Sequence, residues 1–94
     1  MTSTPEHAGM RISSYPKLFL ESIQVEIRCK GYSNCIISLN NLERKILRMM
    51  GVSISAGLNQ IRLDGPDSLS AGPYLLQVMD TVGKCIYESG LTKQ

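Results

Sequence analysis

The sequence predicts a single all-β domain, an antiparallel β-sandwich of six or seven short strands. Turn signals rich in Gly, Pro, Asn, Asp and Ser recur about every 8–12 residues, a spacing typical of sandwiches. The clearest strand, 22–29, alternates apolar and polar residues with period two, as a half-buried antiparallel strand does. A chain of 94 residues has room for one modest core.

Residues 1–14 have the composition of a flexible tail, or of a linker to an upstream segment. Small and polar residues dominate this stretch, and it shows no period. We therefore expect the folded domain to span 15–94. Tyr15 should be extended, because a proline disfavours helical backbone in the residue before it. Residues 17–20 follow as an edge strand or an extended lead-in.

Two strands, 22–29 and 35–40, flank a stretch with the length and composition of a hairpin loop. In such a hairpin Cys29 and Cys35 face inward from paired strands. They are then either two buried thiols or a cross-strand disulfide. The chain has three cysteines, so at least one has no partner within the chain.

The segment after the second strand begins with a turn. Asn40 and Asn41 suit left-handed or Asx-turn geometry. Residues 45–50 are then expected to form a strand that ends at Gly51. A short helix is the alternative, because three apolar residues also have helical spacing. These residues are Leu42, Ile46 and Met49.

A loop at 53–57 leads to a predicted strand at 58–63, and a second loop follows at 64–68. The second loop contains Asp64 and Asp67. Two carboxylates without an EF-hand pattern indicate an ordinary turn rather than a calcium site.

The turn at 69–73 leads into a predicted strand at 74–80. Both faces of this strand are largely apolar, which predicts a central strand covered on both sides. Tyr74 at its start is either a tyrosine corner, with its hydroxyl bonded to upstream backbone, or a plain core tyrosine. A hairpin turn at 81–84, a last strand at 85–90 and a polar end complete the chain.

No group of residues has a catalytic or metal-binding pattern. The single histidine, His7, lies in the predicted tail, and the cysteines show no CxxC pair or zinc-ligand spacing. The acidic residues are scattered singly, and the sequence has no glycine-rich phosphate loop. We therefore expect a protein that is not an enzyme and uses no cofactor, metal or small-molecule substrate.

Charge and hydropathy argue against two further classes. The net charge of +2 and the lack of a basic face argue against nucleic acid as a partner. No apolar run approaches the roughly 20 residues of a membrane span. Residues 1–10 lack the apolar core of a signal peptide. The chain is thus expected to stay in the cytoplasm or to be part of a larger exported protein.

Several short motifs follow one another along the chain. Tyr15-Pro16 opens the predicted domain, and residues 41–45 read Asn-Leu-Glu-Arg-Lys. Residues 69–74 read Leu-Ser-Ala-Gly-Pro-Tyr, and Gly83-Lys84 precedes the last strand.

In this order and spacing, residues 12–94 resemble the C-terminal sorting domain of the type IX secretion system of Bacteroidetes, the Por-secretion type A family. That family typically opens with Tyr-Pro-Asn-Pro, has a turn reading Asp-Leu-x-Gly-Arg, continues with Leu-x-x-Gly-x-Tyr, and closes with Gly-Lys, a strand and a basic end. The matching residues are Tyr15, Pro16, Leu42, Gly57, Leu69, Gly72, Tyr74, Gly83, Lys84 and Lys93. Leu18, Arg44 and Pro73 stand where the family has its second proline, its turn glycine and an ordinary strand residue.

The resemblance implies an immunoglobulin-like sandwich with a non-catalytic role. Domains of this family follow a cargo protein and are recognised at the outer membrane by the secretion machinery. The cargo then reaches the cell surface or the medium by way of the periplasm. Recognition is expected to rest on exposed strand edges and turns. The alternative is a generic immunoglobulin-like adhesion or structural module of a cell-surface protein.

The sequence also predicts weak self-association. The expected edge strands at 17–20 and 45–50 carry few charges, which leaves them open to edge-to-edge pairing in a homodimer. Cys85 is expected to link two chains under oxidising conditions.

Overall fold

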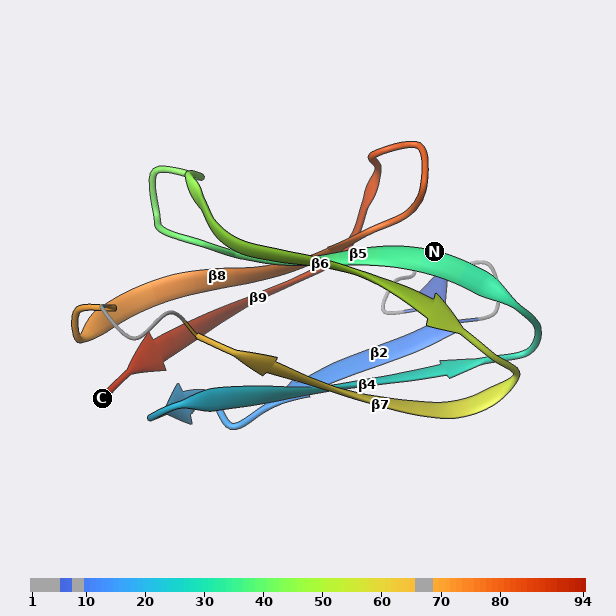
Figure 1. Cartoon of the computed structure of the whole chain (residues 1–94), viewed down its shortest axis with the longest axis horizontal. Helices are drawn as coiled ribbons and strands as arrows, with labels where there is room; N and C mark the ends of the chain where they lie inside the picture. Colours follow the sequence, from blue (N-terminus) through green and yellow to red (C-terminus); the bar gives the residue numbers. More distant parts are fainter. Residues whose placement is uncertain (1–5, 8–9, 66–68) are drawn as a thin grey trace.

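Two stacked β-sheets make up the computed structural model, which describes residues 6–7, 10–65 and 69–94 (Figure 1). These ranges contain nine strands and no helix. The strands are β1 (Glu6–His7), β2 (Met10–Tyr15), β3 (Leu18–Phe19), β4 (Ser22–Cys29), β5 (Ser33–Asn40), β6 (Ile46–Ile54), β7 (Gly57–Asp64), β8 (Gly72–Met79) and β9 (Cys85–Lys93). The predicted all-β sandwich is confirmed, with nine strands in the described residues in place of the six or seven expected.

The strand order is that of an immunoglobulin-like sandwich. One sheet has the order β1-β2-β4-β7 and the other the order β3-β9-β8-β5-β6. The pairs β4–β7 and β5–β8 take the places of strands B–E and C–F of that fold. The strand pairs are antiparallel apart from β3–β9, which is short and parallel.

Alternation along the central strands builds the core between the sheets. In β4 every second residue is buried, and its polar residues face outward. Ile37 and Leu39 of β5 oppose this row from the other sheet. The largest side chains with essentially no exposure are Phe19, Ile23, Ile27, Ile37, Leu39, Ile54, Leu63 and Leu76. The core therefore rests mainly on Ile and Leu, whose burial is the main force that holds the two sheets together.

The predicted flexible tail is wrong from Met10 onward. β2 pairs with β4 from Arg11 to Tyr15, and Met10 and Ile12 are only 3% and 5% exposed. The folded domain thus begins before Tyr15. His7, also placed in the tail, belongs to β1, while residues 1–5 and 8–9 of the predicted tail lie outside the described residues.

The predicted hairpin between the second and third long strands is also wrong. β4 and β5 belong to different sheets, so the chain crosses from one sheet to the other between them. Cys29 is paired with Gly57, and Cys35 with Val52. The two cysteines are not cross-strand neighbours, and both are buried free thiols. Of the two alternatives for Cys29 and Cys35, the structure therefore has buried thiols and not a disulfide.

Two strands run further than the sequence indicated. β6 continues through Gly51 to Ile54, which confirms a strand rather than a short helix but corrects its end. β9 continues to Lys93, and Leu91, in the predicted polar end, is buried. Both extensions occur because the neighbouring strand supplies backbone partners beyond the local turn signal.

β8 is central in its sheet but is covered on one side only. Tyr74, Leu76 and Val78 face the core, whereas alternate residues on the outer face are half-exposed. The predicted burial of both faces is therefore wrong, because no third layer covers this sheet in the described part of the chain. In the predicted Asp loop, Asp64 ends β7 and pairs with Arg62 at 2.8 Å, while Asp67 lies outside the described residues.

Candidate recognition surface

A tyrosine corner anchors the start of β8. The Tyr74 hydroxyl donates a 2.7 Å hydrogen bond to the Ser70 carbonyl, four residues upstream. Its ring meets the Phe19 ring edge to face, with 6.4 Å between the centroids. Of the two alternatives for Tyr74, the corner is confirmed. The hydrogen bond fixes the entry of the chain into the strand while the ring fills the core.

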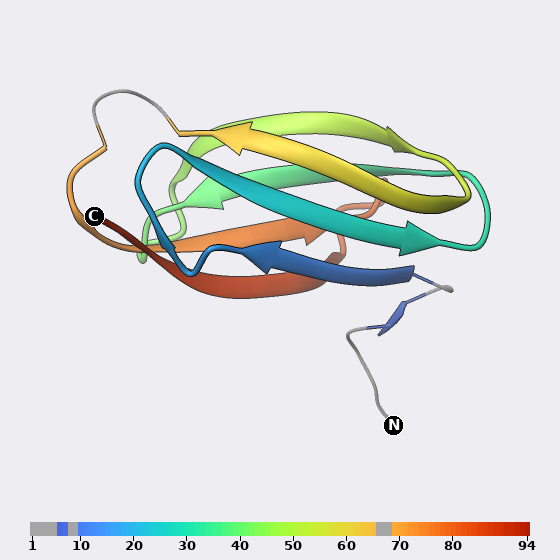
Figure 2. The same cartoon turned by 90° about the horizontal axis from the view of Figure 1, so that it is seen from below.

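The corner gathers other motif residues at one end of the sandwich. Leu69 packs against the core, and Gly72, at φ 140°, pairs with Lys93 across β8 and β9. The C-terminal strand is held there from its other side as well, because the Thr92 amide donates to the Lys17 carbonyl at 2.7 Å. Lys17 lies in the segment that follows β2, and Figure 2 shows the C-terminus beside that segment. Leu69, Gly72, Tyr74 and Lys93 thus form one structural unit.

The motif turn at 41–45 is an Asx turn between β5 and β6. The Asn41 side-chain oxygen accepts hydrogen bonds from the amides of Glu43 and Lys45, both at 2.9 Å. The Asn41 backbone amide donates to the Lys45 carbonyl, and its carbonyl accepts from the Arg44 amide, both at 3.0 Å. The predicted Asx geometry is therefore found at Asn41.

The turn between β8 and β9 has the same set of hydrogen bonds. The Asp80 carboxylate accepts from the amides of Val82 and Lys84, at 3.1 and 2.9 Å. The Asp80 backbone amide donates to the Lys84 carbonyl and its carbonyl accepts from the Gly83 amide. The two five-residue turns, 41–45 and 80–84, therefore have the same hydrogen-bond pattern, and we call them the twin turns.

The fourth position of both turns has left-handed backbone. Gly83 has φ 86°, and Arg44, at the equivalent position, has φ 67°. A glycine adopts this conformation without steric cost, whereas Arg44 is the one non-glycine residue of the described chain with positive φ. The 41–45 turn therefore has the backbone geometry of a glycine turn with a residue that disfavours it.

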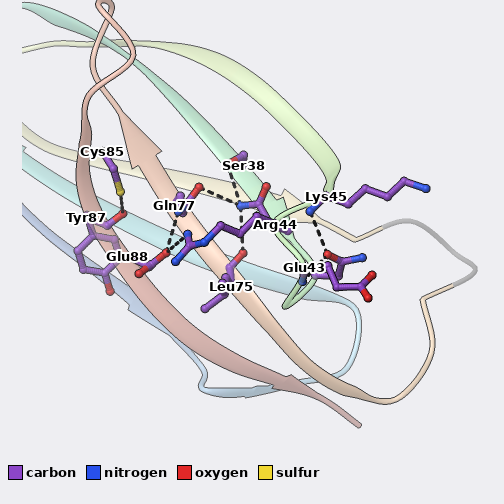
Figure 3. Close-up of polar contacts among 11 residues, drawn as sticks. Ser38, Glu43, Arg44, Lys45, Leu75, Gln77, Cys85, Tyr87 and Glu88 are labelled. Carbon is purple, nitrogen blue, oxygen red and sulfur yellow. Dashed lines mark hydrogen bonds and ion pairs between the residues drawn. The ribbon is translucent and has the colours of Figure 1, made fainter.

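A polar network connects the 41–45 turn to the outer face of the five-stranded sheet (Figure 3). Arg44 pairs with Glu88 of β9 at 3.2 Å, and the Gln77 amide of β8 donates to the same Glu88 oxygen at 2.7 Å. The Asn40 amide of β5 donates to Gln77 at 3.3 Å and to Ser38 at 3.2 Å. Asn40 is 2% exposed and Ser38 is 0% exposed. The network therefore continues from an exposed ion pair into fully buried polar groups.

Both turns rise from this outer face, at opposite ends of the upper sheet in Figure 1. Leu42 at the tip of the first turn is 58% exposed, and Lys84 in the second is exposed too. The surface between the turns carries hydrogen-bonding groups and half-exposed apolar side chains. Surfaces of this mixed kind are able to bind another polypeptide.

The opening motif lies elsewhere, on the four-stranded sheet. Tyr15 ends β2, and its hydroxyl donates to Glu26 of β4 at 2.8 Å. Gln60 of β7 donates to the same Glu26 oxygen at 3.1 Å. These two hydrogen bonds, that from Gln60 first, lower the pKa of Glu26, and the bond to Glu26 raises the pKa of Tyr15. The exposed Pro16 follows through a cis peptide bond, and Gly57 begins β7.

The motif residues therefore fall into separate groups rather than one site. Four of them form the corner at the end of β8 and β9, and Leu42, Gly83 and Lys84 occupy the twin turns. The network through Asn40, Gln77 and Glu88 was not predicted, because outward-facing polar residues in strands normally signal plain solvent exposure. The Asn-Asn pair at the end of β5 was the available signal.

The remaining findings bear on other classes of function. No group of three or more His, Cys, Asp or Glu residues is arranged to hold a metal ion within the described ranges. None of the elements in those ranges is a helix long and apolar enough to cross a membrane. No family model matches the chain, and no curated protein matches it either.

Proposed function

We propose that this chain is a non-catalytic C-terminal sorting domain that directs an attached cargo through the type IX secretion system to the cell surface. The observation that carries this proposal is the 41–45 turn. Its Asn-Leu-Glu-Arg-Lys sequence departs from the Asp-Leu-x-Gly-Arg motif at Arg44, yet Arg44 adopts the left-handed backbone that suits glycine. The motif resemblance thus extends to the geometry of the position where the sequence departs from it.

A second observation supports the same proposal. The Leu-x-x-Gly-x-Tyr segment forms the tyrosine corner at the start of β8, with Gly72 at positive φ. The three named positions of that motif, Leu69, Gly72 and Tyr74, thus each have a structural role in this chain. Recognition would rest on folded shape, namely the tips of the twin turns and the edges of the sheets.

A fusion experiment tests the proposal. A fluorescent protein with an export signal is joined upstream of residues 10–94, because β2 begins at Met10. The fusion is expressed in a Bacteroidetes host with and without a working type IX system. We expect surface or medium fluorescence only in the competent host. Periplasmic retention in both hosts would refute the sorting function.

Surface variants separate recognition from folding. Leu42→Ser and Lys84→Ala change exposed turn tips without touching the core, and we expect them to reduce export. Lys30→Ala, an exposed change in the connection between β4 and β5, is the matched control and should export normally. Equal export by all three variants would exclude the twin turns as the recognised surface.

The second candidate is an immunoglobulin-like adhesion or structural module. The strand order β4–β7 and β5–β8 favours it as much as a sorting domain, because many surface modules share this arrangement. A fusion that folds but stays in the periplasm of the competent host is the result expected for this candidate.

A further inference from the structure

We propose that β6 is a homodimer interface, at which it pairs antiparallel with β6 of a second copy of this chain. This inference concerns self-association and does not depend on the sorting function. It starts from the four strands that end the two sheets, which are β1, β7, β3 and β6. A sheet edge presents unpaired backbone N–H and C=O groups, and proteins normally protect such edges.

Three of the four edges are protected against pairing. β1 and β3 are two residues long, too short to hold a partner strand. Behind them, β2 has only residues 12–15 unpaired on that side, and the unpaired part of β9 carries the charged Glu88. β7 carries the ion pair between Arg62 and Asp64 on its outward face. The turn that precedes β7 is also held by the Asn59 side chain, which donates to the Ser55 carbonyl at 2.9 Å and accepts from the Ser55 amide at 3.0 Å.

β6 has none of these protections. It is nine residues long, contains no proline, and has Arg48 as its one charged residue. Among the described residues its strand neighbour is β5 alone. Ile46 and Met49 are 50% and 58% exposed. A long edge of this kind with few charges is expected to pair with another strand.

The side chains of β6 favour a second copy as the occupant. In an antiparallel pair with its two-fold axis at Met50, Met49 of each chain lies opposite Gly51 of the other. Both residues are on the outer face, because they pair with Ser38 and Ile36 of β5. A Cβ built at Gly51 would meet nothing within 4 Å, so each Met49 side chain has open space to occupy.

The same register avoids charge repulsion. Arg48 lies opposite Val52 of the partner's strand, so the single charge of each β6 does not meet its own copy. Like charges directly opposite each other destabilise a strand pair, whereas apolar cross-strand pairs stabilise it. β6 is therefore complementary to itself in this register, which is the requirement for a two-fold interface.

Sedimentation of the full 94-residue chain under reducing conditions tests the proposal. We expect the weight-average mass to rise from the monomer value of 10.4 kDa toward twice that value as the concentration increases from about 10 μM to about 1 mM. Met49→Lys and Gly51→Lys should each hold the chain as a monomer over this range. Val82→Lys, at an exposed apolar position in the 80–84 turn, should dimerise as the unchanged chain does.

Cross-linking tests the register. In a Cys85→Ser background, a mixture of Met49→Cys and Gly51→Cys chains should give disulfide-linked heterodimers faster than either variant alone. An unchanged chain that stays a monomer at the highest concentration would overturn the proposal. Dimers that persist in both lysine variants, with thermal unfolding like that of the unchanged chain, would place the interface elsewhere and overturn it as well.

Discussion

Replacement of Arg44 by glycine should stabilise the domain, because it removes the one left-handed non-glycine residue of the described chain. The 80–84 turn serves as an internal reference, since Gly83 holds the equivalent position with the same hydrogen bonds. The reciprocal change, Gly83→Arg, should destabilise the domain. Both changes lie on the surface in turns and leave the core intact.

The magnitude follows from three opposing effects. Left-handed backbone costs a non-glycine residue roughly 1–2 kcal/mol. Glycine adds about 0.5–1 kcal/mol of entropy to the unfolded chain, which offsets part of the gain. The exposed pair between Arg44 and Glu88 is worth about 0.2–0.5 kcal/mol. The expected net gain for Arg44→Gly is about 0.5 kcal/mol.

Arg44→Ala isolates the backbone effect, because it loses the ion pair but keeps the left-handed strain. We expect Arg44→Gly to exceed Arg44→Ala by about 1 kcal/mol in the free energy of unfolding. For a domain of this size that difference corresponds to roughly 4–8 °C in Tm. Urea unfolding followed by circular dichroism measures it. A glycine variant no more stable than the alanine variant would refute the assignment of strain to Arg44.

Three further predictions concern other parts of the sandwich. Tyr74→Phe should lower the free energy of unfolding by about 1 kcal/mol, because it removes the hydrogen bond to Ser70; an unchanged urea midpoint would contradict the corner. Gln60→Ala should raise the pKa of Glu26 toward its ordinary value in an NMR titration, since the Gln60 hydrogen bond is the largest effect that lowers it. Because the folded-state pKa of Glu26 is lowered, its contribution to stability is present above the unfolded pKa and is lost as pH falls through the folded pKa; this acid-side loss should shrink in the variant. A thiol reagent should label the exposed Cys85 in the folded protein and the two buried thiols only after unfolding, and burial also raises the pKa of Cys35; early labelling of all three would show that the sandwich opens readily.

The strands themselves were largely predictable from the sequence. The alternation in β4 identified both the strand and its buried face, and the turn residues around 41–45 and 81–84 marked two real hairpins. The longer of the two missed strands, β2, carries the same alternation in Met10 and Ile12, but the surrounding Ser and Thr residues had the composition of a tail. Both signals are local, which is why one sequence sufficed to read them.

The partners of the strands could not be read locally. The segment after Cys29 has the composition of a hairpin loop, yet it crosses between sheets, because β2 and β7 already pair with the two edges of β4. The polar network has the same origin. Asn40 gains its hydrogen bond to Gln77 only when β8 brings Gln77 to it from 37 residues away, and β9 then supplies Glu88 as a partner for Gln77.

The sequence by itself determined the all-β class, most of the strands and the turn chemistry, because side-chain alternation and turn residues act on their own backbone. Tertiary structure alone decided the strand order, the left-handed backbone of Arg44 and the open edge at β6. These depend on contacts between segments distant in the chain. The packing of two sheets around one core selects such contacts as a whole, and it can impose a backbone conformation that the local residue disfavours.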